Sequence, residues 1–116
     1  MRLKLIVALV SDDKTDIVVD AARDAGATGA TIVTSARGEG LIPEKTFLGL
    51  ELETIRDIVM FLVVEPRARD ILERISAAAH FDSEHGTGIA FQIDVEDAVG
   101  MITQLPTIYE ELTPEI

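Results

Sequence analysis

The most informative stretch of the chain is Gly86-Thr87-Gly88-Ile89-Ala90-Phe91-Gln92-Ile93-Asp94-Val95. In its second part the apolar residues Ile89, Phe91, Ile93 and Val95 share one face of an extended segment, and Gln92 and Asp94 share the other. This alternation predicts a β-strand. The two glycines before it predict a tight turn that leads into the strand.

Three further strands and two helices are expected before this strand. Ser11, followed by two aspartates, predicts the N-cap of a helix that ends at Gly26, and Pro66 suits the first turn of a second helix. The expected strands are residues 3–10, 30–36, 57–64 and 89–95. This order predicts an α+β fold, a ferredoxin-like βαββαβ sandwich with an antiparallel sheet and two helices on one face.

The chain is expected to form a single domain over residues 1–116. Two helix-to-strand segments resemble each other, Ala-Thr-Gly-Ala at 27–30 and Gly-Thr-Gly-Ile at 86–89, and we expect both at the same end of the sheet. A connection over residues 37–56 joins the second and third expected strands, and an acidic tail covers residues 103–116. A connection of this length is commonly functional.

Charge and composition exclude several classes of protein. The net charge is −11, and no lysine or arginine follows Arg74, whereas nucleic-acid binding needs a basic face. The same charge disfavours anionic lipid, and no apolar segment approaches the roughly 20 residues that span a bilayer. The chain contains no cysteine, which favours a cytoplasmic protein without disulfides or thiolate chemistry.

Catalytic and metal sites are not expected. The only histidines are His80 and His85, and a Glu84-His85 pair acting on Ser83 is less plausible than a solvated turn. Small ferredoxin-like acylphosphatases hold phosphate with an arginine after the first strand, where this chain has Ser-Asp-Asp-Lys at 11–14. Asp82, Glu84 and His85 form too small a ligand set for a metal unless another element completes it.

Two segments suggest binding instead. Glycines in the Gly86-Thr87-Gly88 turn let backbone N–H groups approach an anion, although a simple helix-to-strand turn also uses glycine. The connection is unusually apolar, which indicates a partner protein or an interface between copies of the chain. Its candidate partner-binding residues are Leu41, Ile42, Phe47, Leu48 and Leu50.

The chain resembles the nitrogen regulatory protein P-II (PII) family of signalling proteins, as a divergent member. Thr28-Gly29-Ala30-Thr31 is similar to the family's Thr-Gly-Met-Thr, and Arg37-Gly38-Glu39-Gly40 to the Lys-Gly-Phe-Gly that opens its T-loop. Residues 47–51, Phe-Leu-Gly-Leu-Glu, stand where the family has Tyr-Arg-Gly-Ala-Glu. Gly86-Thr87-Gly88-Ile89 stands in place of Gly-Asp-Gly-Lys, the B-loop, and residues 91–95 resemble Phe-Val-Phe-Asp-Val.

The resemblance implies a cytoplasmic homotrimer that is not an enzyme. Each cleft between subunits would bind an adenine nucleotide, with the T-loop base of one subunit and the B-loop of its neighbour. The T-loop would then control a partner protein such as a membrane transporter or a metabolic enzyme. The residues carried over to the cleft are Thr28, Gly29, Thr31, Gly38, Gly40, Gly86, Thr87 and Gly88.

Departures from the family pattern change the expected ligand. The B-loop lysine is Ile89 here, and two phosphate-binding arginines fall at Gly100 and Ile102, so AMP or ADP suits the site better than ATP. The pair that helps bind 2-oxoglutarate is Leu41-Ile42, so sensing of that acid is not expected. The modified tyrosine aligns with Phe47, which has no hydroxyl to accept a uridylyl group.

Two other binding proteins with the same element order remain alternatives. One is a ligand-independent or amino-acid-binding module of the ACT type. The other is a trimeric divalent-cation-tolerance protein, which would use Asp82, Glu84 and His85.

Overall fold

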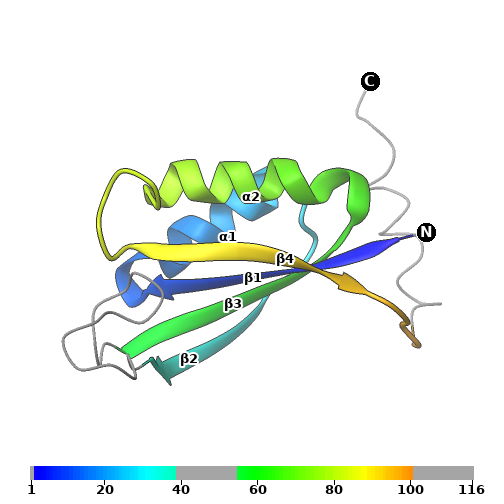
Figure 1. Cartoon of the computed structure of the whole chain (residues 1–116), viewed down its shortest axis with the longest axis horizontal. Coiled ribbons are helices and arrows are strands. Elements are labelled where there is room, and N and C mark those ends of the chain that lie inside the picture. The colour runs from blue at the N-terminus through cyan, green and yellow to red at the C-terminus, as the bar shows by residue number, and fades with distance from the viewer. Residues whose placement is uncertain (1, 39–54, 101–116) are drawn as a thin grey trace.

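The computed structural model describes residues 2–38 and 55–100. Within them the elements follow one another in the expected order, and the chain can be followed through them in Figure 1. They are β1 (Leu3–Ser11), the short 3-10 helix η1 (Asp12–Lys14), α1 (Thr15–Asp24), β2 (Thr31–Arg37), β3 (Ile55–Val64), α2 (Glu65–Ala79) and β4 (Gly88–Val95). The predicted acidic tail, 103–116, lies outside the described residues.

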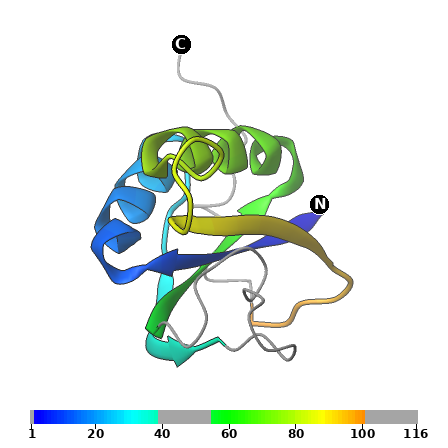
Figure 2. The ribbon, with the colours of Figure 1, turned by 60° about the vertical axis from the view of Figure 1, so that its left-hand side comes forward.

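The four strands form one antiparallel sheet in the order β2-β3-β1-β4. Both helices cover the same face of it, as Figure 2 shows. Alternate residues of β1 and β3 point into this layer and are fully buried there, Ile6 and Phe61 among them, against Val18 of α1 and Ile71 of α2. The predicted ferredoxin-like fold is therefore confirmed.

The expectation that the two helix-to-strand segments lie at the same end of the sheet is wrong. β2 and β1 run in the same direction, because both are antiparallel to β3, whereas β4 runs opposite to β1. Since each helix returns the chain to the end where its preceding strand began, β2 and β4 are entered from opposite ends. The similarity between residues 27–30 and 86–89 therefore does not bring the two segments together.

Ser11 does not have the predicted N-cap interaction. It ends β1 with an extended backbone, and its side chain makes no capping hydrogen bond to the turn that follows. The 3-10 helix η1 intervenes before α1 begins at Thr15. The Ser11 amide instead donates to the Thr87 carbonyl at 3.1 Å, which joins the end of β1 to the segment before β4.

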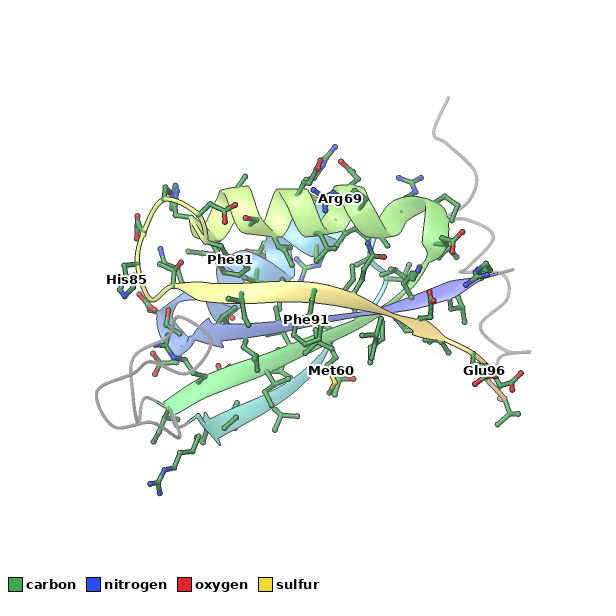
Figure 3. The ribbon with its side chains drawn as sticks, viewed as in Figure 1. Met60, Arg69, Phe81, His85, Phe91 and Glu96 are labelled. Carbon is green, nitrogen blue, oxygen red and sulfur yellow. The ribbon has the colours of Figure 1, made fainter. Side chains whose placement is uncertain are left out.

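The sheet face opposite the helices, here called the outer face, is apolar, and no helix within residues 2–38 and 55–100 covers it. Strand register aligns three rows across β4, β1 and β3 on this face: Ile93-Leu5-Leu62, Phe91-Val7-Met60 and Ile89-Leu9-Ile58 (Figure 3). Leu62 and Phe91 are each 41% exposed and Ile93 is 47% exposed. A contiguous apolar patch of this kind usually marks an interaction surface.

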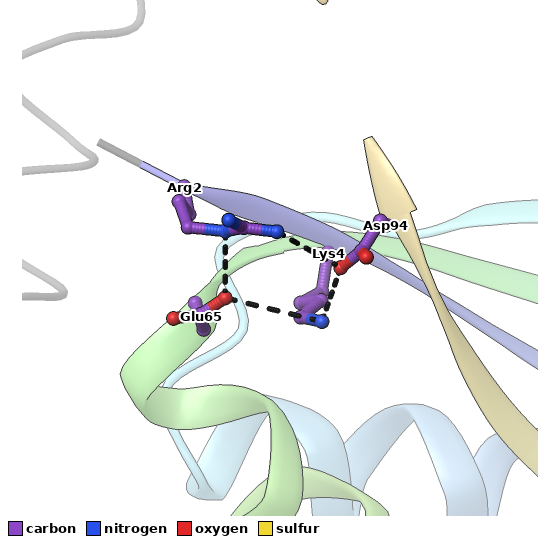
Figure 4. A network of polar contacts seen from close by, with 4 residues as sticks. All are labelled: Arg2, Lys4, Glu65 and Asp94. Atoms are coloured by element: carbon purple, nitrogen blue, oxygen red, sulfur yellow. Dashed lines mark hydrogen bonds and ion pairs between the residues drawn. The ribbon is translucent and has the colours of Figure 1, made fainter. Parts of the chain in front are cut away.

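A cluster of ion pairs ties β1, α2 and β4 together where β1 begins (Figure 4). Arg2 Nε lies 2.9 Å from Glu65 Oε2, and the Glu65 amide donates to the Arg2 carbonyl at 2.9 Å. Lys4 Nζ contacts Asp94 and lies 3.9 Å from Glu65 Oε2. The hydrogen bond and the positive charge of Lys4 lower the pKa of Asp94.

We predict that Asp94→Asn lowers the melting temperature at pH 7 and low salt. The pKa of Asp94 is lower in the folded than in the unfolded chain, so its contribution is present above the unfolded pKa and is lost as the pH falls through the folded one. The difference from wild type should therefore shrink in acid and in 1 M salt. Calorimetry against pH, with Asp97→Asn as a charge-matched control, measures this. Equal melting temperatures of Asp94→Asn and wild type at pH 7 would contradict it.

Candidate functional site

The polar residues of interest gather where β1 ends. One row crosses all four strands there: Ala36 of β2 is paired with Arg56 of β3, Arg56 with Ser11 of β1, and Ser11 bonds to Thr87 next to β4. We call residues 11–15, 35–38, 55–57 and 84–88 the loop edge. Neighbouring strands are about 4.8 Å apart, so the row spans roughly 14 Å, a length that suits a nucleotide-sized ligand.

The turn before β4, the predicted B-loop, is held by hydrogen bonds within the chain. α2 ends at Ala79 and is followed by His80, whose backbone is left-handed (φ 60°), and Phe81 N–H donates to the Ser76 carbonyl at 3.0 Å. The buried Thr87 hydroxyl lies 3.1 Å from the His80 carbonyl and 3.2 Å from the Glu84 carbonyl. The turn is therefore preorganised, and Thr87 points into the protein instead of toward a ligand.

The two glycines of this turn have different structural roles. A Cβ on Gly88 would lie 2.7 Å from the Leu9 carbonyl oxygen and 2.7 Å from Phe81 Cε1, so packing alone requires glycine there. Figure 3 shows Phe81 between α2 and the start of β4. Gly86 has φ +78° and no atom within 4 Å of its Cβ position, so the space beside it is open to a ligand.

Arg56 was assigned from the sequence only to the end of the connection, yet it is central to the loop edge. It is 4% exposed, and its Nη1 donates to the Gly86 carbonyl at 2.7 Å. Its Nε is buried without a hydrogen-bond partner. Among residues 2–38 and 55–100, no carboxylate lies within ion-pair distance of it.

Asp57 is a second residue that sequence reasoning missed. Asp57 is 8% exposed, and its carboxylate accepts hydrogen bonds from Thr15 Oγ1 at 2.7 Å and Ser35 N–H at 3.4 Å. Ser35 has φ +61° and lies at a register shift between Val33 and Ala36, typical of a β-bulge. Asp57 thus fixes the direction in which β2 enters the long connection. The signal in the sequence was an Arg-Asp pair directly before an apolar strand.

The predicted site residues fall into separate groups. Gly38, Gly86, Thr87 and Gly88 lie at the loop edge, so the residues predicted as T-loop base and B-loop come together there within one chain. Thr28 and Gly29 are exposed before β2, at the other end of that strand, and Thr31 is paired with Met60 at the level of the central outer-face row. Outside the described residues lie Gly40, Leu41, Ile42, Phe47, Leu48 and Leu50.

Two of the three possible metal ligands have other partners. Asp82 accepts a hydrogen bond from Ser76 Oγ at 3.2 Å, and Glu84 lies 3.8 Å from Lys14 Nζ. In the described part of the chain, no group of three or more His, Cys, Asp or Glu residues is placed to hold a metal ion. The same residues contain no helix long and apolar enough to cross a membrane.

An open groove between α2 and β4 shares only Gly88 with the loop edge. Its lining includes Phe81 and Gly88, and four of its polar side chains pair with one another. Arg69 Nε lies 3.0 Å from Glu73 Oε1, and Ser76 bonds to Asp82. The loop edge, where a buried cation has an unused donor, is the stronger candidate.

A protein-family model, Nitrogen regulatory protein P-II, matches residues 3–104. The chain belongs to this family. Family membership confirms the resemblance drawn from the glycine motifs and from the last strand. No curated protein sequence matches the chain.

Solved structures agree with the PII assignment. A PII-like signalling protein from Thermus thermophilus is 25% identical, with a TM-score of 0.60 over 82% of this chain and 88% of that one. CPII of Thiomonas intermedia, a nitrogen regulatory PII-like protein, has been solved with ADP and bicarbonate; it is 21% identical, with a TM-score of 0.58 over 84% of this chain and 91% of that one. A further CPII structure holds ADP, AMP and acetate.

The fold is shared more widely than the family. The divalent ion tolerance protein CutA1 of Ehrlichia chaffeensis has a TM-score of 0.70 over 97% of this chain and 96% of that one, at 9% identity. At such low identity the likeness concerns the fold alone. It therefore does not favour the metal-binding alternative.

The structure predicts different costs for the two B-loop glycines. Gly88→Ala should lower the free energy of unfolding by about 1–3 kcal/mol more than Gly86→Ala, because the added methyl meets the Leu9 carbonyl, which cannot move without disturbing β1. Gly86→Ala adds only the strain of a left-handed backbone. Urea unfolding of both variants measures the difference. Equal losses of stability would show that the packing around Gly88 is wrongly described.

Proposed function

We propose that this PII-family chain is a non-enzymatic regulator that assembles as a homotrimer, binds an adenine nucleotide between copies and controls a partner protein through the connection 37–56. The observation that carries the proposal is the apolar outer face, which adjoins the loop edge and which no described helix covers. Family membership and the nucleotide-bound CPII structures support it.

The outer face suits an interface between copies. Its rows continue across β4, β1 and β3, and it is at least as apolar as the face that the helices cover. A sheet whose two faces are both apolar needs two covering layers, and α1 and α2 supply one. Three copies packed through this face would supply the other, in a closed cyclic arrangement.

Packing of this kind explains how the separated site residues can share one ligand. Within one chain, Thr28 and Gly29 lie at the end of β2 away from Gly38 and the B-loop. Thr31 lies on the outer face itself. In our proposal the loop edge of one copy faces residues 28–31 of the next, and the nucleotide lies between them. This revises the expected division, in which the T-loop base and the B-loop came from different subunits.

The ligand we propose is AMP or ADP. Ile89 lies in an apolar row with Leu9 and Ile58, an environment unsuited to a triphosphate, and Gly100 is exposed without a side chain to offer. CPII binds ADP and AMP, which have fewer charges than ATP. Small oxyanions such as the bicarbonate and acetate found in CPII are candidates for a second effector.

The partner surface we propose is the connection, with its apolar residues 41, 42, 47, 48 and 50. Asp57 fixes the bulge that leads into it, so the B-loop and the start of the connection are parts of one hydrogen-bonded edge. A ligand at that edge would shift the connection between binding-competent and other states. A transporter or metabolic enzyme in the cytoplasm is the kind of partner we propose.

The ligand proposal is tested by thermal shift with AMP, ADP and ATP. ADP at a hundredfold excess over its Kd should add about 2.7 kcal/mol, a shift of several degrees, and ATP should give no larger shift. Gly86→Asp should abolish the shift while keeping the fold, because aspartate tolerates a left-handed backbone. Ala77→Asp, on the exposed side of α2, adds the same charge away from the site and should keep the shift. No shift of the wild type with any nucleotide at millimolar concentration would contradict the proposal.

The trimer is tested by Leu62→Glu with size exclusion and light scattering. A carboxylate at the centre of an apolar interface should release monomers, since a buried unpaired charge is strongly unfavourable. Ile17→Glu is the matched control, because Ile17 is 39% exposed on α1, away from the outer face. Its oligomeric state should not change. A wild type that elutes as a monomer would contradict the proposed assembly.

A further inference from the structure

Arg56 is a buried cation that has no carboxylate within ion-pair distance among the described residues. It is only 4% exposed, and its only described hydrogen bond is to a neutral carbonyl, that of Gly86. Burying a guanidinium without an anion is costly, and an unused buried donor adds to that cost. Its Nε is such a donor. An anion supplied by a bound ligand would compensate the buried charge of Arg56 and accept a hydrogen bond from its unused donor.

The surroundings of Arg56 point to the direction from which such an anion comes. Gly86, whose carbonyl Arg56 holds at 2.7 Å, has open space on its Cα, with no atom within 4 Å of a Cβ placed there. Among the described residues, Asp13 lies near enough to Arg56 and Lys14 to feel both charges, and Lys14 pairs with Glu84. The Ser11 hydroxyl lowers the pKa of Asp13, and the charges of Lys14 and Arg56 contribute, so Asp13 is ionised and close enough to affect Arg56.

We propose that the Arg56 guanidinium binds an oxyanion at the loop edge, the phosphate of the nucleotide or a separate small oxyanion. A guanidinium presents a planar fork of donors that matches a phosphate or carboxylate. Arg56 thereby replaces the cations that the family pattern places at residues 89, 100 and 102. This rests on the proposed function for the nucleotide, but the oxyanion site does not require the ligand to be one.

A purely structural role of Arg56, as a support for the B-loop, makes a different prediction. A support would affect every ligand that contacts the B-loop, charged or neutral. An oxyanion site affects only ligands that carry the anion. Comparison of ADP with adenosine separates the two roles, because both contain the same base and sugar.

The test is calorimetric titration of the wild type and three variants with ADP, adenosine and inorganic phosphate. Arg56→Gln should lower the affinity for ADP about ten- to a hundredfold and leave the affinity for adenosine unchanged. Asp13→Asn should raise the affinity for ADP, because it removes a carboxylate that repels the phosphates, and should not change the affinity for adenosine. Arg23→Gln, an exposed arginine on α1, has the same charge change as Arg56→Gln and should behave as wild type. If Arg56→Gln does not fold, Asp13→Asn and competition of phosphate with ADP on the wild type carry the test.

The outcomes distinguish this inference from the proposed function. Equal losses of ADP and adenosine affinity in Arg56→Gln, or no loss of either, would overturn the oxyanion site and leave the nucleotide proposal standing. If the wild type binds phosphate but no nucleotide, and Arg56→Gln loses the phosphate, the oxyanion site is supported and the nucleotide proposal is contradicted. A wild type that binds neither ADP nor phosphate at millimolar concentration would overturn both. Phosphate that displaces ADP identifies the nucleotide's own phosphate as the anion, and phosphate that binds beside ADP identifies a separate one.

Discussion

The four-stranded sheet has two apolar faces, and its two helices cover only one of them. On the covered face, Ile6, Phe61 and their neighbours are sealed from water. On the outer face, Leu62, Phe91 and Ile93 retain more than two-fifths of their exposure. Burying apolar area contributes about 25 cal/mol per Å², so this face favours association strongly. The assembly, the placing of the site and the path of the signal in our account all depend on how that face is covered.

The loop edge shows how such a site can form with few cations. Strand register brings the ends of β1 and β2 and the starts of β3 and β4 into one row, and backbone groups make several of the contacts within it. Thr87 and Asp57 are turned inward, where they hold the B-loop and the bulge in β2. What remains for a ligand is the open side of Gly86 and the buried charge of Arg56. In a chain of net charge −11, one enclosed guanidinium can have an effect that many exposed ones lack.

Local patterns in the sequence were sufficient to predict the elements and the fold. Alternation in residues 89–95 and the proline at the start of α2 gave strand and helix limits within a residue or two of those observed. It was harder to predict which segments lie at the same end of the sheet, because this depends on strand direction and pairing. The similarity of residues 27–30 and 86–89 therefore suggested a proximity that antiparallel pairing forbids. Ser11 had the composition of an N-cap, but its extended backbone joins β1 to Thr87.

Arg56 and Asp57 could not be predicted as site residues, and the reason is the same for both. Arg56 and Asp57 acquire their roles through partners 22 to 42 positions away, Gly86, Ser35 and Thr15. Motif reasoning found the glycines, because glycine patterns are local, but could not tell that Gly88 is required by packing and that Gly86 is open. The signal that could have identified both positions is the presence of charged residues at the beginning of an apolar strand.

The central claim is that each ligand site is completed by two copies of the chain, and subunit mixing tests it most directly. Gly86→Asp damages the loop edge, and Gly29→Trp places a bulky side chain where Gly29 has no atom within 4 Å of its Cβ position. Each variant alone should bind no ADP. After unfolding and joint refolding of equal amounts, about a quarter of the clefts should combine the undamaged half of each and bind ADP, as random assembly of a cyclic oligomer predicts. A mixture that binds no more ADP than the separate variants would contradict the claim.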